Sequence, residues 1–137
     1  MSPPWKSPAV GDIVWCHFPE LPQSHPGPKP RPALVVRVTI KDDGAAVMVA
    51  YGSSQRLDRL LSGEFAIRQA LHPAAFALAG LSFDTKFSFR QMVDLPWTND
   101  FFEVPPKAMH GHNPKLGTLH PSMMHAAAAA HRAATES

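Results

Sequence analysis

The sequence predicts a mostly β fold, a small and strongly curved sheet or SH3-like barrel, with a helix at its C-terminal end. The chain has 137 residues, enough for one domain with a single core. Short runs of β-branched and aromatic residues recur between turn signals, and the 15 prolines favour loops and short strands over helices. The last segment, HPSMMHAAAAAHRAATES, has the alanine content typical of a helix.

Five strands are expected from these runs, at residues 11–18, 32–40, 45–54, 64–69 and 85–96. The second and third are separated by the turn sequence KDDG, so they should form a hairpin. In the fifth strand Phe87 and Phe89 share one face, and a bend is expected near Gln91. Residues 55–63 mix helical spacing with a Ser-Gly break, which predicts a short turn or helix. The segment NDFFEVPP predicts one more short extended piece.

The domain boundaries follow from the same pattern. Residues 1–10, with Pro3, Pro4 and Pro8, are expected to form an extended lead-in. Residues 11–120 should form a single barrel domain, and residues 121–137 an alanine-rich helix and tail that starts near Ser122. The apolar face of that helix is thin, so loose docking is expected.

Charge and cysteine content limit the classes of function. The formal net charge is +2 and the pI is about 8.9, which is compatible with binding nucleic acid but does not demand it. The single cysteine, Cys16, excludes an internal disulfide and favours a reducing compartment. The sequence shows no signal peptide and no segment long enough to span a membrane, so a cytoplasmic protein without membrane contact is expected.

The stretch PGPKPRPALVV places one arginine, Arg31, between Pro30 and Pro32 at the start of a strand. Proline fixes its own φ and pushes the preceding residue towards extended geometry, so the backbone of Arg31 has little freedom. The planar guanidinium is always charged and its paired donors match phosphate oxygens. A solvated arginine beside a stiff turn would explain these residues equally well.

Cleavage of RNA without a metal needs a base for the 2′-hydroxyl, an acid for the leaving 5′-oxygen and a cation for the phosphorane charge. His25 lies six positions before Arg31 on the same loop, so the two side chains can face one pocket. The predicted hairpin also brings the end of the third strand, YGSSQ, near the start of the second. Taken singly, His25 is explained as a solvated loop residue and the serines as turn formers. Taken together, these residues are more informative and indicate phosphate chemistry.

Other residues offer weaker chemistry. No carboxylate or cysteine stands at ligand spacing from His110, His112, His120 and His125, so no metal site and no other cofactor is expected. Cys16 lies in a predicted strand and is expected to be a small buried hydrophobe.

The segments GDIVWCHFPE, a loop rich in proline and glycine, RPALVV, and a strand closing in SSQ resemble the start of the MazF/PemK family of toxin endoribonucleases. The likeness is close over residues 11–55 and looser to about residue 96, and the pairing of GDIVW with RPALVV at this separation is its most specific part. The resemblance implies an SH3-like barrel with a C-terminal helix, assembled as a homodimer. It also implies the toxin of a type II toxin–antitoxin system, which cuts single-stranded RNA without metal to a 2′,3′-cyclic phosphate and a 5′-hydroxyl. A cognate antitoxin would restrain it by occupying the RNA groove.

The resemblance assigns roles residue by residue. Arg31 falls on the family's catalytic arginine, Ser53 on its catalytic threonine or serine, and His25 on a histidine that PemK-like members use. It implies that the RNA is bound by Lys29, Ser54, Gln55 and Lys86. The family's acidic residue on the later strand has no counterpart in TKFSFRQMVDLP, where Asp94 comes several residues late.

A second class of function remains open from the sequence. A non-catalytic SH3-like barrel could bind a peptide or nucleic acid through aromatic side chains, which also serve as ordinary core residues. The aromatic residues concerned are Trp5, Trp15, Trp97, Phe101 and Phe102.

Overall fold

The computed structural model describes residues 5–136. The expected lead-in at residues 1–10 includes residues 1–4, which lie outside the described part, as does residue 137. The strands are β1 (Asp12–Cys16), β2 (Arg31–Lys41), β3 (Gly44–Ser53), β4 (Glu64–Ile67), β5 (Thr85–Pro96) and β6 (Lys115–Thr118). The helices are α1 (Pro73–Leu78), the 3-10 turn η1 (Pro121–Met123) and α2 (Met124–Thr135).

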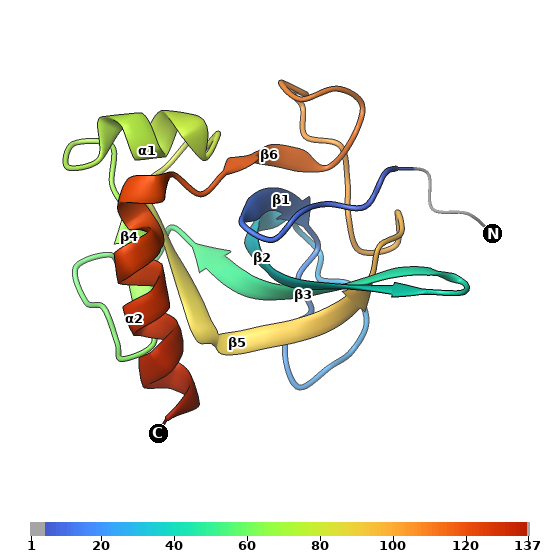
Figure 1. Cartoon of the computed structure of the whole chain (residues 1–137), viewed down its shortest axis with the longest axis horizontal. Coiled ribbons are helices and arrows are strands. Elements are labelled where there is room, and N and C mark those ends of the chain that lie inside the picture. The colour runs from blue at the N-terminus through green and yellow to red at the C-terminus, as the bar shows by residue number, and fades with distance from the viewer. Residues whose placement is uncertain (1–4, 137) are drawn as a thin grey trace.

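The strands form one six-stranded sheet in the order β4-β5-β3-β2-β1-β6, and every neighbouring pair is antiparallel. The two helices lie together at one side of the sheet, and the β2–β3 hairpin extends away from them (Figure 1). The predicted fold class, a mostly β SH3-like barrel with a C-terminal helix, is therefore confirmed. The hairpin closes at the expected turn, where Lys41 pairs with Gly44.

The sheet is buried on both faces, which explains why its central strands are almost continuously apolar. The face towards the helices carries a helix-side core that includes Ile13, Leu34, Phe65, Phe87 and Ala127. The opposite face curls around an inner core that includes Val14, Val35, Val47, Trp97 and Phe102. Trp97 and Phe102 are thus core residues, and Cys16 is a buried free thiol, as expected from the sequence.

The long strand β5 bends where the sequence predicts it. Its partners in β3 shift between Ala50 and Tyr51, which pair with Met92 and Ser88 respectively. The residues between Ser88 and Met92 therefore form an irregular stretch that includes Gln91. A bend of this kind lets one strand pair with β3 along most of its length and with β4 at its start.

Two elements were not predicted. Helix α1 has only six residues, with Pro73 in its first turn and Phe76 buried against the sheet. Strand β6 has four residues and forms by pairing with β1. Residues 55–63 contain turns and no helix.

Helix α2 packs against β4 and β5 through Ala127 and Ala130, both of them buried. Alanine has no bulk beyond Cβ, so the helix can lie close to the sheet, and the loose docking expected from its thin apolar face is not observed. Within residues 5–136, no helix has the length and apolar character needed to cross a membrane.

Candidate functional site

Arg31 is the first residue of β2, where it pairs with Cys16 of β1, and its side chain is half-buried. Its guanidinium carbon lies 5.9 Å from the centre of the Tyr51 ring, within range of a cation–π contact. Among residues 5–136, no carboxylate forms an ion pair with it. The guanidinium therefore lies against an aromatic ring, and its charge has no ion-pair partner within residues 5–136.

The register of β2 and β3 brings Ser53 towards this arginine. Ala33 pairs with Tyr51, and the same register continued by two residues places Arg31 opposite Ser53. The Ser53 hydroxyl oxygen accepts a hydrogen bond from the backbone N–H of Gln55 at 3.0 Å. Its O–H hydrogen remains free to donate to another group.

A close approach between the strands depends on Gly52. A Cβ atom at this position would lie 2.2 Å from the carbonyl oxygen of Pro32 and 2.9 Å from a ring carbon of Phe87. Only glycine fits there without a shift in backbone, so the spacing of β2 and β3 beside Arg31 is set by this residue.

Arg31 lines two separate cavities. The first, here named the Phe83 cavity, has a volume of about 580 Å³, and its walls include Trp15, Arg31, Ser54, Phe83, Lys107 and Met109. The second, here named the Lys29 cavity, has a volume of about 520 Å³, and its walls include Phe18, Glu20, Lys29, Arg31, Tyr51 and Gln91.

Strand geometry explains the separation. Successive residues of a strand point to opposite faces, so Pro32, Gly52 and Ser54 share the face of the helix-side core and line the Phe83 cavity. Tyr51 packs against the inner core and lines the Lys29 cavity. Arg31 stands at the end of the strand and reaches both.

Two of the predicted RNA-binding residues, Lys29 and Ser54, thus lie in cavities that Arg31 lines. His25 lies elsewhere, in a shallow hollow of about 190 Å³ formed by the loop itself. That hollow shares Glu20 and Pro28 with the Lys29 cavity, so the two adjoin each other. Gln55 is exposed and lines neither cavity.

Lys86 is placed differently from what its predicted role implies. Its Nζ donates to the Glu64 carboxylate at 3.0 Å and to the Arg59 carbonyl oxygen at 3.3 Å. The side chains of this ion pair are only 10% and 6% exposed. The ammonium is already satisfied inside the protein and lines neither cavity.

The loop between β1 and β2 is tied to the barrel at its base. The ring nitrogens of His17 lie 3.0 Å from the Gly27 carbonyl oxygen and 2.8 Å from the Glu103 carboxylate. Gly27 also donates its N–H to the His17 carbonyl oxygen, and a Cβ there would collide with the carbonyl oxygen of Phe18 at 2.2 Å. These contacts fix the returning part of the loop, which leads directly into Lys29 and Arg31.

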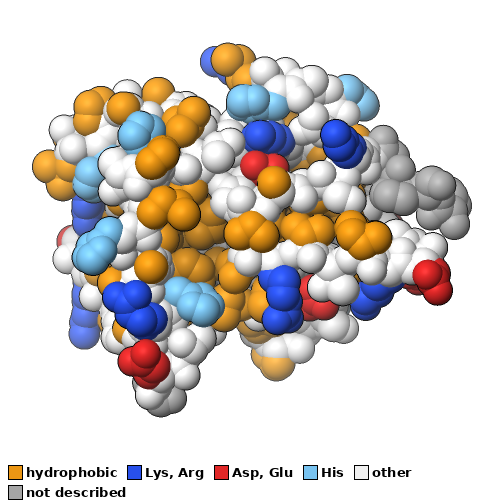
Figure 2. Space-filling view, viewed as in Figure 1, with side chains coloured by type: hydrophobic (Ala, Val, Ile, Leu, Met, Phe, Trp, Pro, Cys, Tyr) orange, Lys and Arg blue, Asp and Glu red, His pale blue; other side chains and the backbone are white. Residues whose placement is uncertain are grey.

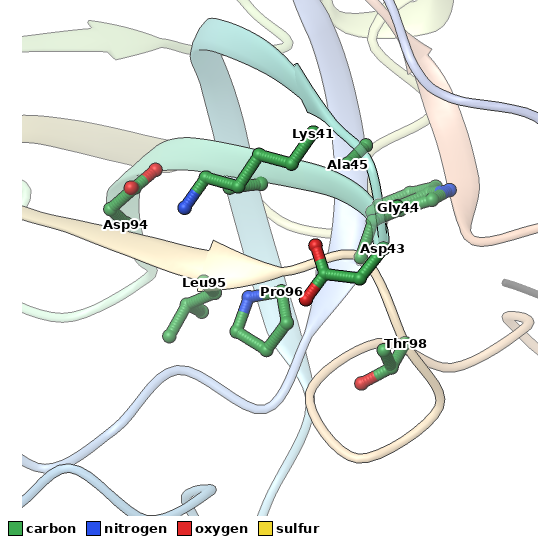
Figure 3. Close-up of a pocket in the computed structure, with 10 residues that line it drawn as sticks. Lys41, Asp43, Gly44, Ala45, Asp94, Leu95, Pro96 and Thr98 are labelled. Carbon is green, nitrogen blue, oxygen red and sulfur yellow. The ribbon is translucent and has the colours of Figure 1, made fainter. Parts of the chain in front are cut away.

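Asp94, the acidic residue of β5, lies well along the strand from the end of the sheet where Arg31 and Tyr51 are found. Asp94 pairs with Met48, six residues along β5 from Ser88, the partner of Tyr51. It lines a smaller hollow of about 200 Å³ beside the turn of the β2–β3 hairpin, together with Lys41 and Asp43 (Figure 3). Nor do three or more His, Cys, Asp or Glu side chains within residues 5–136 gather where they could hold a metal ion.

Several residues that line the two cavities were not predicted from the sequence to lie there. They are Trp15, Glu20, Phe83, Gln91, Lys107 and Met109. Phe83 and Met109 come from loops that precede β5 and β6, and nothing in LSFDT or PPKAMHG marks them as neighbours of Arg31. Their one unusual property, an exposure of 72% and 77%, is visible only in the fold. Lysines and arginines on the face seen in Figure 2 are scattered around exposed hydrophobic side chains and do not form one basic patch.

The fold is thus a small curved sheet in which an arginine without an ion-pair partner in residues 5–136 lies between two cavities. Comparison with known proteins identifies the family. The chain belongs to the PemK-like, MazF-like toxins of type II toxin–antitoxin systems, because the model of that family matches residues 9–130. The resemblance found in the sequence is thus confirmed.

Among solved structures, the chain is similar to an endoribonuclease in complex with its cognate antitoxin from a mycobacterial species. The two are 16% identical and superpose with a TM-score of 0.59 over 95% of this chain and 96% of the other, which shows a shared fold. No curated protein matched the chain.

Proposed function

We propose that this protein is a metal-independent endoribonuclease that cuts single-stranded RNA and acts as the toxin of a toxin–antitoxin pair. One observation carries the proposal: in a chain of this toxin family, the guanidinium of Arg31 has no carboxylate partner among residues 5–136 and lies between two cavities. An uncompensated, positioned guanidinium is suited to the charge that develops on a phosphate during cleavage.

The reaction is an attack by the ribose 2′-hydroxyl on the adjacent phosphorus. A bond from the 2′-oxygen to phosphorus forms, the bond from phosphorus to the 5′-oxygen breaks, and the products are a 2′,3′-cyclic phosphate and a 5′-hydroxyl. Arg31 stabilises the phosphorane through paired N–H donors. The Ser53 oxygen accepts the N–H of Gln55, which leaves its O–H hydrogen available to donate to a phosphoryl oxygen.

The cleavage reaction also needs two proton transfers, one from the 2′-hydroxyl and one to the 5′-oxygen. Glu20 and His25 are titratable side chains of the β1–β2 loop, and both line the hollow of about 190 Å³ that this loop forms. Glu20 also lines the Lys29 cavity, as Arg31 does. We assign the transfers to these two groups, with Lys29 and Ser54 holding the neighbouring RNA backbone.

A cognate antitoxin and a second copy of this chain are the protein partners we propose, in the cytoplasm. The similar mycobacterial endoribonuclease was solved with its antitoxin, which supports the first of these. An antitoxin that occupies the cavities beside Arg31 would exclude RNA. A small open reading frame for a DNA-binding antitoxin next to this gene, and a dimer in sedimentation, would be the corresponding observations.

The test is cleavage of a long single-stranded RNA in the presence of a chelator, with mapping of both new ends. Arg31→Ala should lower the cleavage rate by roughly 10²–10³-fold, as expected for loss of one preorganised donor to the transition state. RNA affinity should fall much less, because ground-state binding is shared with other groups. Arg31→Lys should restore little activity, since an ammonium lacks the planar fork.

Arg37→Ala is the matched control, because Arg37 is an exposed arginine of the same strand that lines neither cavity and donates a hydrogen bond to the sulfur of Met48. It should cleave like the wild type. Cleavage retained by Arg31→Ala would refute the proposed role of the arginine. Salt-sensitive RNA binding without cleavage by the wild type would favour the alternative, a non-catalytic barrel.

A further inference from the structure

We propose that an RNA strand crosses the end of the sheet at Arg31, so that the two nucleosides flanking the scissile phosphate occupy different cavities. One nucleoside lies in the Phe83 cavity on the helix-side face, and the other in the Lys29 cavity on the opposite face. This inference rests on the proposed function and adds to it a base-binding subsite on each side of the cleaved bond.

The position of Arg31 is the first argument. Among residues 5–136 it is the one residue that lines both cavities, and it stands at the first position of strand β2. A strand whose bases occupy both cavities must pass this guanidinium between them. The phosphate linking those two nucleosides is then the one that Arg31 contacts.

The Phe83 cavity has the chemistry of a stacking site. The residues Phe83 and Met109 are 72% and 77% exposed, although they are large and apolar, and Lys107 adds a positive charge to the lining of the same cavity. The indole N–H of Trp15, which also lines the cavity, is buried and has no acceptor within residues 5–136. A flat base would cover this exposed apolar surface, with the lysine close enough to neutralise a neighbouring phosphate.

The Lys29 cavity is built for hydrogen bonding. Its floor is the ring pair of Phe18 and Tyr51, whose centres are 5.0 Å apart, and its rim carries Lys29, Glu20 and the exposed amide of Gln91. An amide presents a donor and an acceptor side by side and can read the edge of a base. Stacking tolerates any base, whereas edge reading does not. Base preference should therefore be stronger on the side of the Lys29 cavity.

The occupant we infer is RNA because each cavity pairs aromatic or apolar surface with a lysine, on either side of an arginine that has no ion-pair partner within residues 5–136. Base, phosphate and base follow one another along a nucleic acid strand in the same order. A segment of a partner protein is the other possible occupant, and the experiment separates the two.

The experiment uses the short RNA defined by cleavage mapping, together with two versions in which the base 5′ or 3′ of the scissile phosphate is removed. Phe83→Ala is compared with Gln91→Ala, and Leu71→Ala is the control, because Leu71 is 68% exposed and lines neither cavity. Phe83→Ala should lower kcat/KM by about 5–150-fold, the value of one base–aromatic stack converted to a rate ratio. Leu71→Ala should leave it unchanged.

Coupling between protein and substrate changes is the decisive readout. With the RNA that lacks the base bound in the Phe83 cavity, Phe83→Ala should cause no further loss of kcat/KM. With the RNA that lacks the other base, it should lower kcat/KM by the same factor as with the intact RNA. Gln91→Ala should couple to the opposite base. If both variants couple to the same base, or neither couples to any, the assignment of the two cavities is wrong.

A binding measurement keeps this inference separate from the proposed cleavage. A short 2′-O-methyl RNA of mixed sequence, which has no free 2′-hydroxyl, carries the fluorescent base 2-aminopurine at each position in turn. Quenching at one position by the wild type and not by Phe83→Ala supports the stacking site even if no RNA is ever cut. Absence of binding, or equal quenching by both proteins, overturns it. A weaker antitoxin complex with unchanged RNA binding would assign the cavity to the protein partner and overturn it too.

Discussion

The buried ion pair between Lys86 and Glu64 leads to a prediction that separates a structural role from an RNA-binding role. Lys86→Met keeps the length and most of the volume of the side chain but removes the ammonium. The Glu64 carboxylate, which is 6% exposed, would then keep a single N–H donor, that of Leu61 at 2.9 Å. A carboxylate left in that position without its cation is strongly destabilising.

The expected loss in the free energy of unfolding is about 3–5 kcal/mol, the usual cost of breaking a buried pair by removing one partner. For a chain of this size, 1 kcal/mol corresponds to roughly 3–5 °C in Tm, so Tm should fall by about 10–20 °C. Adding Glu64→Gln removes the second charge and keeps an acceptor for Leu61. The double variant should recover most of the loss.

The assay is thermal unfolding followed by circular dichroism, with salt-dependent RNA binding measured in parallel. Lys29→Met is the control, because Lys29 is exposed in the Lys29 cavity. It should leave Tm unchanged and reduce the salt dependence of RNA binding by about one phosphate contact. An unchanged Tm in Lys86→Met, together with weaker RNA binding, would refute the structural role and restore Lys86 as an RNA ligand.

Three further predictions concern the frame of the site. Gly52→Ala should destabilise the protein by about 1–3 kcal/mol in urea unfolding and also reduce cleavage, because the new Cβ pushes the carbonyl of Pro32, next to Arg31, away from β3; wild-type behaviour would show that the strands separate easily. Burial raises the pKa of the Cys16 thiol, so the folded state keeps its proton when the unfolded state loses it. Stability should therefore decrease as pH rises above about 9, by up to about 1.4 kcal/mol per pH unit, and a Cys16→Ala variant with the same slope would contradict this. Glu103→Ala should change stability by only about 0–1 kcal/mol, since the carboxylate is half-exposed, but should speed limited proteolysis of the β1–β2 loop that His17 holds; an unchanged digestion rate would mean that the loop does not depend on this contact.

Local patterns in the sequence were sufficient for the central part of the fold. The strands that became β1, β2, β3 and β5 have β-branched or aromatic residues between glycine and proline signals, and these preferences agree with the tertiary structure. The same is true of the turn KDDG and of the alanine-rich helix. Arg31 could be singled out because two prolines restrict the backbone around it, which is a local property.

The elements that the sequence did not predict are those that need a partner to form. The four residues of β6 have no periodicity of their own and are ordered by pairing with β1. Helix α1 is too short to be stable alone and depends on burying Phe76. Alanine at positions 127 and 130 reads as a thin apolar stripe, yet close packing on β4 and β5 makes it an effective contact surface.

The sequence by itself determined the fold class, the family and the arginine at the start of the second strand, because each depends on residues close together in the chain. Only the tertiary structure decided what surrounds that arginine. Lys86 was predicted to bind RNA, but β4 places Glu64 beside it, and Phe83, which the sequence did not single out, is left 72% exposed by its loop. The burial of a side chain and its distance from other residues depend on contacts between segments that are far apart in the sequence. A local sequence pattern therefore cannot predict which residues surround Arg31.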